Sequence, residues 1–317
     1  MAETTHIVPE DADQTTVAAA VRAMFEGLSW SRARALVASG RVMVDGDVIF
    51  DPAARVFAGS EVRADQTGKR KSARSLPEDA LIFVDHDLAV VIKPPGVETV
   101  PYDENKRDTT SLLAMTLQSL IDTQRRRGGT VQRGLGVVQR LDKETSGVLV
   151  FPRTHAARKA LQGQFRRHAI TRRYVALVRG IPTEQSIETQ LVANRGDGRR
   201  GSWRGGGKPP PEARRAITHI SVLEAFNDAA LVECRLETGR QHQIRIHLSE
   251  LGHPLFGDRI YRARNAPNAP APSRRTMLHA ASLGFTHPSD GRPMHFVAPT
   301  PPDMAQLLHS LRNGDQV

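Results

Sequence analysis

The sequence predicts a protein that contains both helices and strands, with a small N-terminal α/β module in front of a much larger domain. Its 317 residues exceed what one small hydrophobic core usually organises. Apolar residues recur at helical spacing in some segments and form strand-like runs in others, and segment 66–79 is polar and basic like a linker. We therefore expect a module at residues 14–65, a linker at 66–79 and a domain at 80–317.

The N-terminal module is predicted to contain two helices and a hairpin. Apolar residues have helical spacing over 17–25 and 31–39, and Ser29 or Ser31 is the candidate N-cap of the second helix. The pair Asp45-Gly46 separates two apolar runs. Such a pair favours a two-residue hairpin turn, because both central residues of that turn need positive φ.

The larger domain is predicted to begin near Ala80 with a pair of strands. Short apolar runs that end at polar turns give the further strands, and apolar residues at helical spacing after a capping residue give the helices. The expected strands are 81–84, 88–92, 148–151, 174–178 and 231–236. The expected helices begin after Thr109, Thr110 or Ser111, after Thr154, and at His242.

Charge and hydropathy together predict a polyanionic partner and no membrane. The formal net charge is +10 and the pI is about 10.4. No apolar stretch approaches the roughly 20 residues that span a bilayer, and no basic amphipathic helix carries a broad aromatic and leucine face. The polar, acidic N-terminus is unlike a targeting peptide, so a cytoplasmic protein is expected.

Basic residues are concentrated in two tracts. Segment 152–179 carries eight basic residues and no acidic one, which favours nucleic acid over a solvated face. These are Arg153, Arg158, Lys159, Arg166, Arg167, Arg172, Arg173 and Arg179. A second tract, from Arg195 to Arg215, is rich in glycine and proline and is predicted to be a flexible loop, which either embraces a phosphate backbone or only adds solubility.

A single acid in a basic setting is the main candidate for catalysis. Asp142 is flanked by Arg140 and Lys143, and the polar segment 145–147 and an apolar run follow it. An acid held between bases just before a buried strand suits a rigid site in which a carboxylate acts on an anionic ligand. The alternative is an ordinary solvated turn.

The sequence argues against a metal site. Cys234 is the only cysteine, which excludes an intrachain disulfide and a zinc site built on several thiolates. His242 and His247 are five residues apart, a spacing that does not stack two imidazoles on one helical face. The segment from Gly205 to Lys208 is likewise a weak match to a phosphate-binding loop.

The N-terminal module resembles the S-four-type RNA-binding module of ribosomal and RNA-modifying proteins over about 45 residues. The resemblance rests on SWSRARALVASGRVMVDG and on GSEV at 59–62. It implies an RNA-facing helix and loop that carry Ser31, Arg32, Arg34 and Arg41. It implies a core formed by Leu28, Ala35, Leu36, Val42 and Val44. The alternative is a small α/β appendage with exposed arginines.

The larger domain resembles the RluA-type pseudouridine synthases from about Ala80 to about Met304. The ordered matches are Lys93-Pro-Pro-Gly96, Arg140-Leu-Asp-Lys-Glu-Thr-Ser-Gly147, Arg172-Arg-Tyr174, Thr238-Gly-Arg-Gln-His-Gln-Ile-Arg-Ile-His247, Gly252-His-Pro-Leu-Phe-Gly-Asp258 with Tyr261, and Leu278-His-Ala280. The resemblance implies an α+β core, built on a mixed, mainly antiparallel sheet with a central cleft. It also implies conversion of specific uridines in RNA to pseudouridine without a metal or an organic cofactor.

The resemblance also implies the roles of individual residues. Asp142 would attack the anomeric carbon of the sugar or remove a sugar proton to leave a glycal. Arg140 would fill the gap left by the extruded uridine, Tyr174 would stack on the base, and Arg245 would pair with the aspartate. Arg172 is expected to bind RNA, although the family usually has lysine there, and Gln139 stands where the family usually has histidine.

Several alternatives remain at this stage. A module of this type before such a domain is, by resemblance, most typical of enzymes acting on large-subunit ribosomal RNA, but transfer RNA is also possible. A non-catalytic RNA-binding or ribosome-assembly protein is the competing class, and an RNA methyltransferase is disfavoured by the lack of a suitable glycine-rich loop. RNA is the expected partner, and we expect a monomer.

Overall fold

The computed structural model describes residues 3–39, 41–45, 47–49, 52–65, 76–101, 111–126, 134–261, 273 and 275–314. The chain forms two compact units, which meet in the sequence between Leu76 and Pro77. Most of the predicted linker, residues 66–75, and Gly46 of the predicted hairpin turn lie outside the described residues. The second unit contains Asp142, Tyr174 and Arg245.

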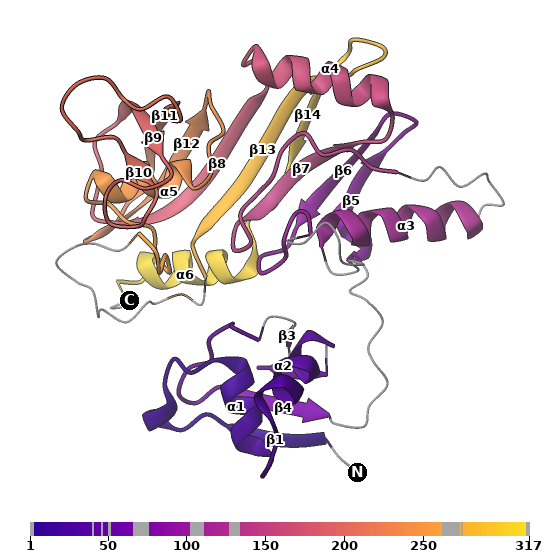
Figure 1. Cartoon of the computed structure of the whole chain (residues 1–317), viewed down its shortest axis with the longest axis vertical. Coiled ribbons are helices and arrows are strands. Elements are labelled where there is room, and N and C mark those ends of the chain that lie inside the picture. Colours follow the sequence, from indigo (N-terminus) through magenta and orange to yellow (C-terminus); the bar gives the residue numbers. More distant parts are fainter. Residues whose placement is uncertain are drawn as a thin grey trace. The chain divides into compact units, whose positions relative to one another are not determined.

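The first unit is an antiparallel sheet of four strands packed with two helices (Figure 1). The strands lie in the order β1-β4-β2-β3. Their bounds are β1 Glu3–Ile7, β2 Val42–Val44, β3 Asp47–Ile49 and β4 Glu61–Asp65. The helices are α1 Val17–Met24 and α2 Trp30–Ala38, and a short 3-10 turn, η1, spans Glu10–Ala12.

The two helices begin at capping hydroxyl groups. The Thr16 Oγ1 atom accepts a hydrogen bond from the Ala19 amide at 3.1 Å, and the Ser29 Oγ atom accepts one from the Arg32 amide at 3.3 Å. A cap of this kind satisfies one of the amide groups that a helix start leaves without a partner. Ser29 is therefore the N-cap of α2, and Ser31 lies in its first turn.

The buried face of α2 differs from the predicted one. Ala33, Leu36 and Val37 are buried, whereas Ala35, which was expected in the core, is exposed. Positions 33, 36 and 37 share one side of a helix with 3.6 residues per turn, and position 35 falls on another side. The prediction for Ala35 was wrong because the buried neighbour of Leu36 is Val37, one residue further along the helix.

The second unit is built on a ten-stranded sheet. Nine strands lie in the order β10-β9-β11-β12-β8-β13-β7-β6-β5, and β14 pairs with β13 beside this path. The bounds are β5 Leu81–Val84, β6 Leu88–Lys93, β7 Ser146–Pro152, β8 Thr171–Arg179, β9 Gln185–Val192, β10 Gly201–Ser202, β11 Arg214–Ala225, β12 Ala229–Leu236, β13 Leu278–Thr286 and β14 Pro293–Val297. Only β13 and β7 pair in parallel among these strands, so the prediction of a mixed, mainly antiparallel sheet is confirmed.

Four helices accompany this sheet: α3 Leu112–Arg126, α4 His155–Arg166, α5 Gln243–Glu250 and α6 Pro302–Arg312. A 3-10 turn, η2 Glu78–Ala80, precedes β5. Helix α4 packs against β7 through Ala157 and Leu161, as its spacing predicted (Figure 1). Thr154 caps α4 and Ser111 caps α3, whereas the alternative caps Thr109 and Thr110 lie outside the described residues.

The segment predicted as a flexible loop, Arg195 to Arg215, is in part a defined turn. The Asn194 Oδ1 atom accepts hydrogen bonds from the amides of Gly196 and Gly198, both at 2.9 Å. Strand β10 then pairs with β9, and β11 begins at Arg214. Glycine content alone gave a wrong impression, because glycines with positive φ also allow the tight turn that joins two paired strands.

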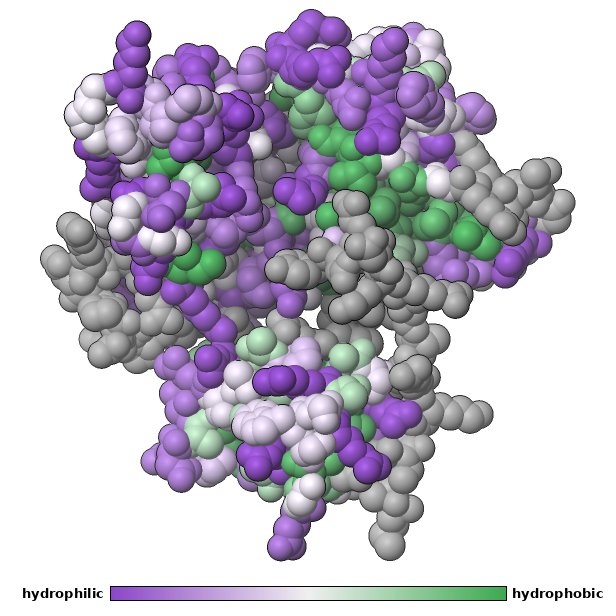
Figure 2. Space-filling view, in the orientation of Figure 1, coloured by the Kyte–Doolittle hydropathy of each residue, from purple (hydrophilic) through white to green (hydrophobic). Residues whose placement is uncertain are grey.

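Hydrophilic residues predominate on the visible face of the second unit over α4 and the β9–β11 region (Figure 2). Among the residues that the structure describes, no helix is both long and apolar enough to cross a bilayer. The apolar residues are instead gathered in clusters around the sheet, such as the cluster of Leu88, Val90, Val148 and Val150 with α4. This core fixes the strand ends that carry the site described next.

Candidate active site

The loop that carries Asp142 is fixed by hydrogen bonds from both sides. The Thr99 Oγ1 atom donates to the Leu141 carbonyl at 2.8 Å and accepts from the Leu141 amide at 3.0 Å. The ammonium group of Lys93, which is fully buried, donates to the Lys143 carbonyl at 2.9 Å. The residues before and after Asp142 are therefore held by the end of β6 and by the segment that follows it.

Strand β7 leaves this loop at Gly147, where the chain makes an unusually close approach to β13. Gly147 has a φ of +119°, and a side chain there would clash with the backbone of Ala280. The neighbouring Ser146 and His279 side chains are hydrogen bonded, with Oγ and Nδ1 2.9 Å apart. Glycine is thus required for the parallel pairing that brings the Asp142 loop beside the centre of the sheet.

Arg245 of α5 binds the carboxylate of Asp142 and a second carboxylate. Its Nη1 atom donates to Asp142 Oδ2 at 3.3 Å, and its Nε and Nη2 atoms donate to the two oxygens of Asp258 at 2.6 and 2.9 Å. The Asp142 side chain is 26% exposed, whereas those of Arg245 and Asp258 are 7% and 0% exposed. Arg245 is thus oriented by a buried acid and presents its remaining donor to a partly exposed one.

The Arg245–Asp258 pair stays charged despite its burial. Burial works to raise the pKa of Asp258, but the Arg245 guanidinium and the amides of Tyr261 and Ile260 hold it below its usual value. Burial also works to lower the pKa of Arg245, but its hydrogen bonds and the charges of both acids raise it overall. Asp258 ends the matched segment Gly252–Asp258, but no role was predicted for it. Its signal in the sequence is an acid directly after apolar residues and a glycine.

His242 lies on another side of Asp142. It is the N-cap of α5 with φ +60°, a left-handed conformation that is uncommon outside glycine. Its Nε2 atom is 3.9 Å from Asp142 Oδ2, and its Nδ1 atom is 2.9 Å from the Tyr261 hydroxyl. Burial lowers the pKa of His242 and raises that of Tyr261 to about 12, so both are neutral near pH 7.

The turn before α5 is held by Gln243, which the sequence analysis did not single out. Its Oε1 atom accepts from the Thr238 hydroxyl at 2.8 Å and from the Arg240 amide at 3.0 Å. Its Nε2 atom donates to the Ile217 carbonyl and the Thr218 hydroxyl of β11. A buried side chain with every group bonded explains why the backbone at His242 can hold its strained conformation.

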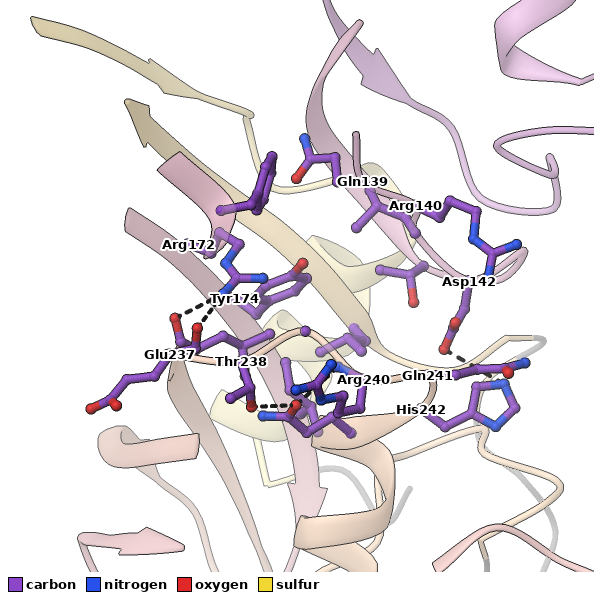
Figure 3. Close-up of a pocket in the computed structure, with 18 of the residues that line it drawn as sticks. Gln139, Arg140, Asp142, Arg172, Tyr174, Glu237, Thr238, Arg240, Gln241 and His242 are labelled. Carbon is purple, nitrogen blue, oxygen red and sulfur yellow. Dashed lines mark hydrogen bonds and ion pairs between the residues drawn. The ribbon is translucent and has the colours of Figure 1, made fainter. Parts of the chain in front are cut away.

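Tyr174 and Arg172 come from β8, on the side of the space opposite Asp142 (Figure 3). Tyr174 is half-buried, and burial raises the pKa of its phenol. Arg172 is buried, burial lowers its pKa, and its Nη2 atom donates to the Glu237 carbonyl at 2.7 Å. Its guanidinium is thus already engaged with the backbone.

Asp142, Arg172, Tyr174 and His242 line one cavity of about 660 Å³. This volume is within the roughly 300–1,000 Å³ typical of ligand pockets. Figure 3 shows Arg140 and Asp142 on one side, Arg172 and Tyr174 on the other, and the Arg240–His242 turn between them. Arg245 and Arg166 also line it. The structure therefore brings the predicted residues Asp142, Tyr174, Arg245, Arg140, Arg172 and Arg166 together around a single space.

The remaining predicted RNA-binding residues lie outside this cavity. Arg167 is exposed directly after α4, next to the cavity residue Arg166. Four others belong to the first unit, where Ser31, Arg32 and Arg34 are exposed and Arg41 is half-buried. The predicted RNA-binding residues are thus distributed over both units.

Cys234 and the acidic groups offer no metal centre in the described part of the chain, where no group of three or more potential ligands gathers. Cys234 of β12 is fully buried, and burial raises the pKa of its thiol. It lies opposite Tyr174 in the register of β12 and β8. The polar groups that line the cavity are hydroxyls, guanidiniums, imidazoles, side-chain amides and the two partly exposed carboxylates of Asp142 and Glu237.

Comparisons with known proteins agree with this geometry. Residues 87–250 match the family model described as RNA pseudouridylate synthase. A "Ribosomal large subunit pseudouridine synthase D" from Zymomonas mobilis is 36% identical over 310 residues, covering 92% of each chain, and one from Escherichia coli is 31% identical over 306 residues, covering 92% of this chain and 89% of the relative. The solved structure of "Human RNA Pseudouridylate Synthase Domain Containing 4" has a similar fold, with a TM-score of 0.59 and 24% identity over 74% of this chain and 93% of that one.

Proposed function

We propose that this chain, which belongs to the RNA pseudouridylate synthase family, converts specific uridines of large-subunit ribosomal RNA to pseudouridine. As a family member it is an isomerase that moves uracil from a glycosidic nitrogen to carbon five of the same ring. The main support for a catalytic role is the partly exposed Asp142 carboxylate, which Arg245 holds inside the cavity. The relatives that match over almost their whole length support the ribosomal substrate.

Asp142 is the proposed catalytic residue. Two acids line the cavity, Asp142 and Glu237, and Asp142 is the one held by Arg245; the Glu237 carboxylate is bonded to His219 instead. The step breaks the bond between the anomeric carbon and N1, and the uracil leaves with the bonding electron pair. The Asp142 oxygen either bonds to that carbon and is displaced when carbon five attacks, or removes a sugar proton and returns it when carbon five bonds. The uracil then turns and rejoins through carbon five, which loses its proton while N1 gains one. Arg245 fixes the oxygen that reacts and supplies the positive charge beside it.

Tyr174 is proposed to contact the extruded uracil, and Arg140 is proposed to fill the position that the uridine leaves in the RNA. Tyr174 faces the cavity from β8, and its neutral ring offers a flat apolar surface for the uracil. Arg140 is exposed at the rim, where its side chain can occupy the position that the uridine leaves in the RNA. Both roles require the base to leave its stack, as enzymes acting on bases generally do.

The cavity rim and α4 are proposed to contact RNA phosphates through Arg166 and Arg167. Both are exposed, while the buried face of α4 is occupied by Ala157 and Leu161. Arg172 is proposed to act differently. It is buried and bound to the Glu237 carbonyl, so it contributes positive potential to the cavity wall rather than an exposed contact.

The first unit is proposed to be an S-four-type RNA-binding module. Its support is the exposed row of Ser31, Arg32 and Arg34 on α2. The exposed indole of Trp30 adjoins this row, with the Arg34 guanidinium carbon 5.8 Å from its ring centre. A surface of this kind combines phosphate-binding charge with a ring on which a base can stack.

We expect the double change Arg32→Gln and Arg34→Gln to raise KM for RNA several-fold and to leave kcat unchanged. The module adds effective concentration without taking part in the chemistry. Steady-state rates of tritium release from uridine-labelled ribosomal RNA measure both constants. As a control of equal charge, Arg292→Gln with Arg312→Gln removes two arginines that pair with acids on the second unit. A loss of kcat in the first variant alone would show that the module belongs to the active site.

The substrate proposal is tested by mapping pseudouridines in RNA from cells that lack the protein. We expect one or a few sites to be lost from large-subunit ribosomal RNA and to return when the wild-type chain is supplied. Supplying the Asp142→Asn chain separates a catalytic role from a role in ribosome assembly. If the role is catalytic, this chain does not restore the pseudouridines; if the role is assembly alone, it does. Loss of sites from transfer RNA alone would overturn the ribosomal assignment.

A further inference from the structure

Arg200 has no hydrogen-bond or ion-pair partner among the described residues, although it is half-buried. Its arginine neighbours in the same tract are engaged. Arg195 binds Asp197 and Glu250, Arg199 donates to the Ile260 carbonyl at 3.1 Å, and Arg215 pairs with Glu188. A guanidinium that no described acid engages leaves its donors available to an anion that the protein does not itself supply.

The turn that carries Arg200 is held in place rather than loosely exposed. The Arg195 Nη1 atom donates to Glu250 Oε1 of α5 at 3.3 Å, and the Ser202 amide donates to the same oxygen at 3.0 Å. Arg200 stands between these two anchors, directly before β10. Its position is thus fixed relative to α5, the helix that carries Arg245.

Arg200 does not line the cavity, but its turn is close to the residues beside Asp142. The hydrogen bond from Arg199 to Ile260 places the turn next to Tyr261, whose hydroxyl is bonded to His242, the residue 3.9 Å from Asp142 Oδ2. Burial is the main influence on the pKa values of His242 and Tyr261, and the charge of Arg200 acts on both as well. Arg200 is therefore near the group that reacts with the sugar.

The covalent structure of RNA then determines which anion reaches this place. If Asp142 acts on the sugar of the target uridine, that sugar lies at Asp142, and the two phosphates joined to it lie close by. Tyr174 lies on the opposite side of the space, where the base is proposed to stack (Figure 3). We expect the RNA chain to leave the cavity past the residues around Asp142, and the turn of Arg200 lies close to these residues.

We propose that Arg200 binds a phosphate attached to the sugar of the target uridine and so fixes the sugar against Asp142. The proposal rests on the proposed function, because it takes the substrate to be a uridine within RNA. A guanidinium can bind a phosphate through two parallel hydrogen bonds, which fixes direction as well as distance. Arg200 is thus a residue that binds substrate, separate from Arg245, which binds the catalytic acid.

The test compares binding of uridine 3′,5′-bisphosphate with binding of uridine by calorimetry, for the wild-type chain and Arg200→Gln. These probes do not depend on which RNA is the natural substrate, so their result stands apart from that of pseudouridine mapping. We expect the variant to bind the bisphosphate about tenfold more weakly, as for one charged hydrogen-bonded contact that is partly solvated. Its affinity for uridine should equal that of the wild type.

Two matched variants complete the design. Arg204→Gln removes the same charge from an exposed position of the same tract and should bind both probes as the wild type does. Arg200→Lys keeps the charge and should lose less than Arg200→Gln. The proposal is overturned if Arg200→Gln binds the bisphosphate normally, if it loses uridine affinity equally, or if the wild-type chain does not prefer the bisphosphate.

Discussion

Replacing Asp142 with asparagine is expected to reduce pseudouridine formation by roughly a thousandfold or more, as removal of a group that forms or breaks bonds does. The amide has nearly the same shape but is a poor nucleophile and a poor base. Arg245 remains bound to Asp258, so the cavity keeps its form. RNA affinity should stay within a few fold, because the proposed RNA contacts are on other residues.

Tritium release from carbon five of labelled uridine measures the rate, and filter binding measures the affinity. Asp228→Asn is a suitable control, since Asp228 is an exposed aspartate outside the cavity lining. We expect its rate to equal that of the wild type. Turnover by Asp142→Asn at the wild-type rate would remove Asp142 from the chemistry, and a parallel collapse of RNA affinity would give it a binding role instead.

Replacing Asp258 with asparagine is expected to lower the free energy of unfolding of the second unit by about 3 kcal/mol, the lower end for breaking a buried ion pair. The Arg245 guanidinium would remain buried with only its 3.3 Å contact to Asp142. We expect the rate to fall as well, because Arg245 loses the partner that orients it. Urea unfolding and tritium release measure the two effects.

The Asp258 contribution also has a defined pH dependence. The pKa of Asp258 is lower in the folded protein than in the unfolded chain, so the unfolded state takes up its proton first as the pH falls. The contribution is present above the unfolded pKa, near 4, and is lost as the pH falls through the lower folded pKa. The difference in stability between wild type and Asp258→Asn should therefore shrink as the pH falls below about 4.

Glu188→Gln serves as the control for this experiment. Glu188 pairs with Arg215 through two hydrogen bonds, as Asp258 does with Arg245, but both side chains are largely exposed. We expect little change in stability, because water solvates the separated charges. Equal losses in the two variants would mean that burial does not set the importance of the Asp258 pair.

Local patterns in the sequence were sufficient for the elements that depend on near neighbours. The strands β5 and β6 and the apolar face of α4 follow from runs and spacing of apolar residues, and the structure confirms them. The Asp142 loop was recognisable because an acid between bases directly precedes the buried strand β7. Resemblance, rather than periodicity, gave the sheet as a whole.

Contacts between segments far apart in the sequence could not be predicted from local patterns. Nothing local indicates that Arg245 uses two of its nitrogens on Asp258, or that Gln243 joins the turn before α5 to β11. Arg200 shows the same limit, since it is one of many arginines in a glycine-rich tract. That no described residue pairs with it becomes apparent only when the partners of Arg195 and Arg199 are known.

The thiol of Cys234, the only one in the sequence, can be used to measure transient separation of β8 and β12. The thiol is fully buried on β12, directly across from Tyr174 of β8. A thiol reagent can reach it only when these strands separate, and no other cysteine in the chain competes for the reagent. The rate of labelling in native buffer therefore measures how often strands β8 and β12 separate. A slower rate in the presence of RNA would show how much the bound substrate stabilises this part of the cavity wall.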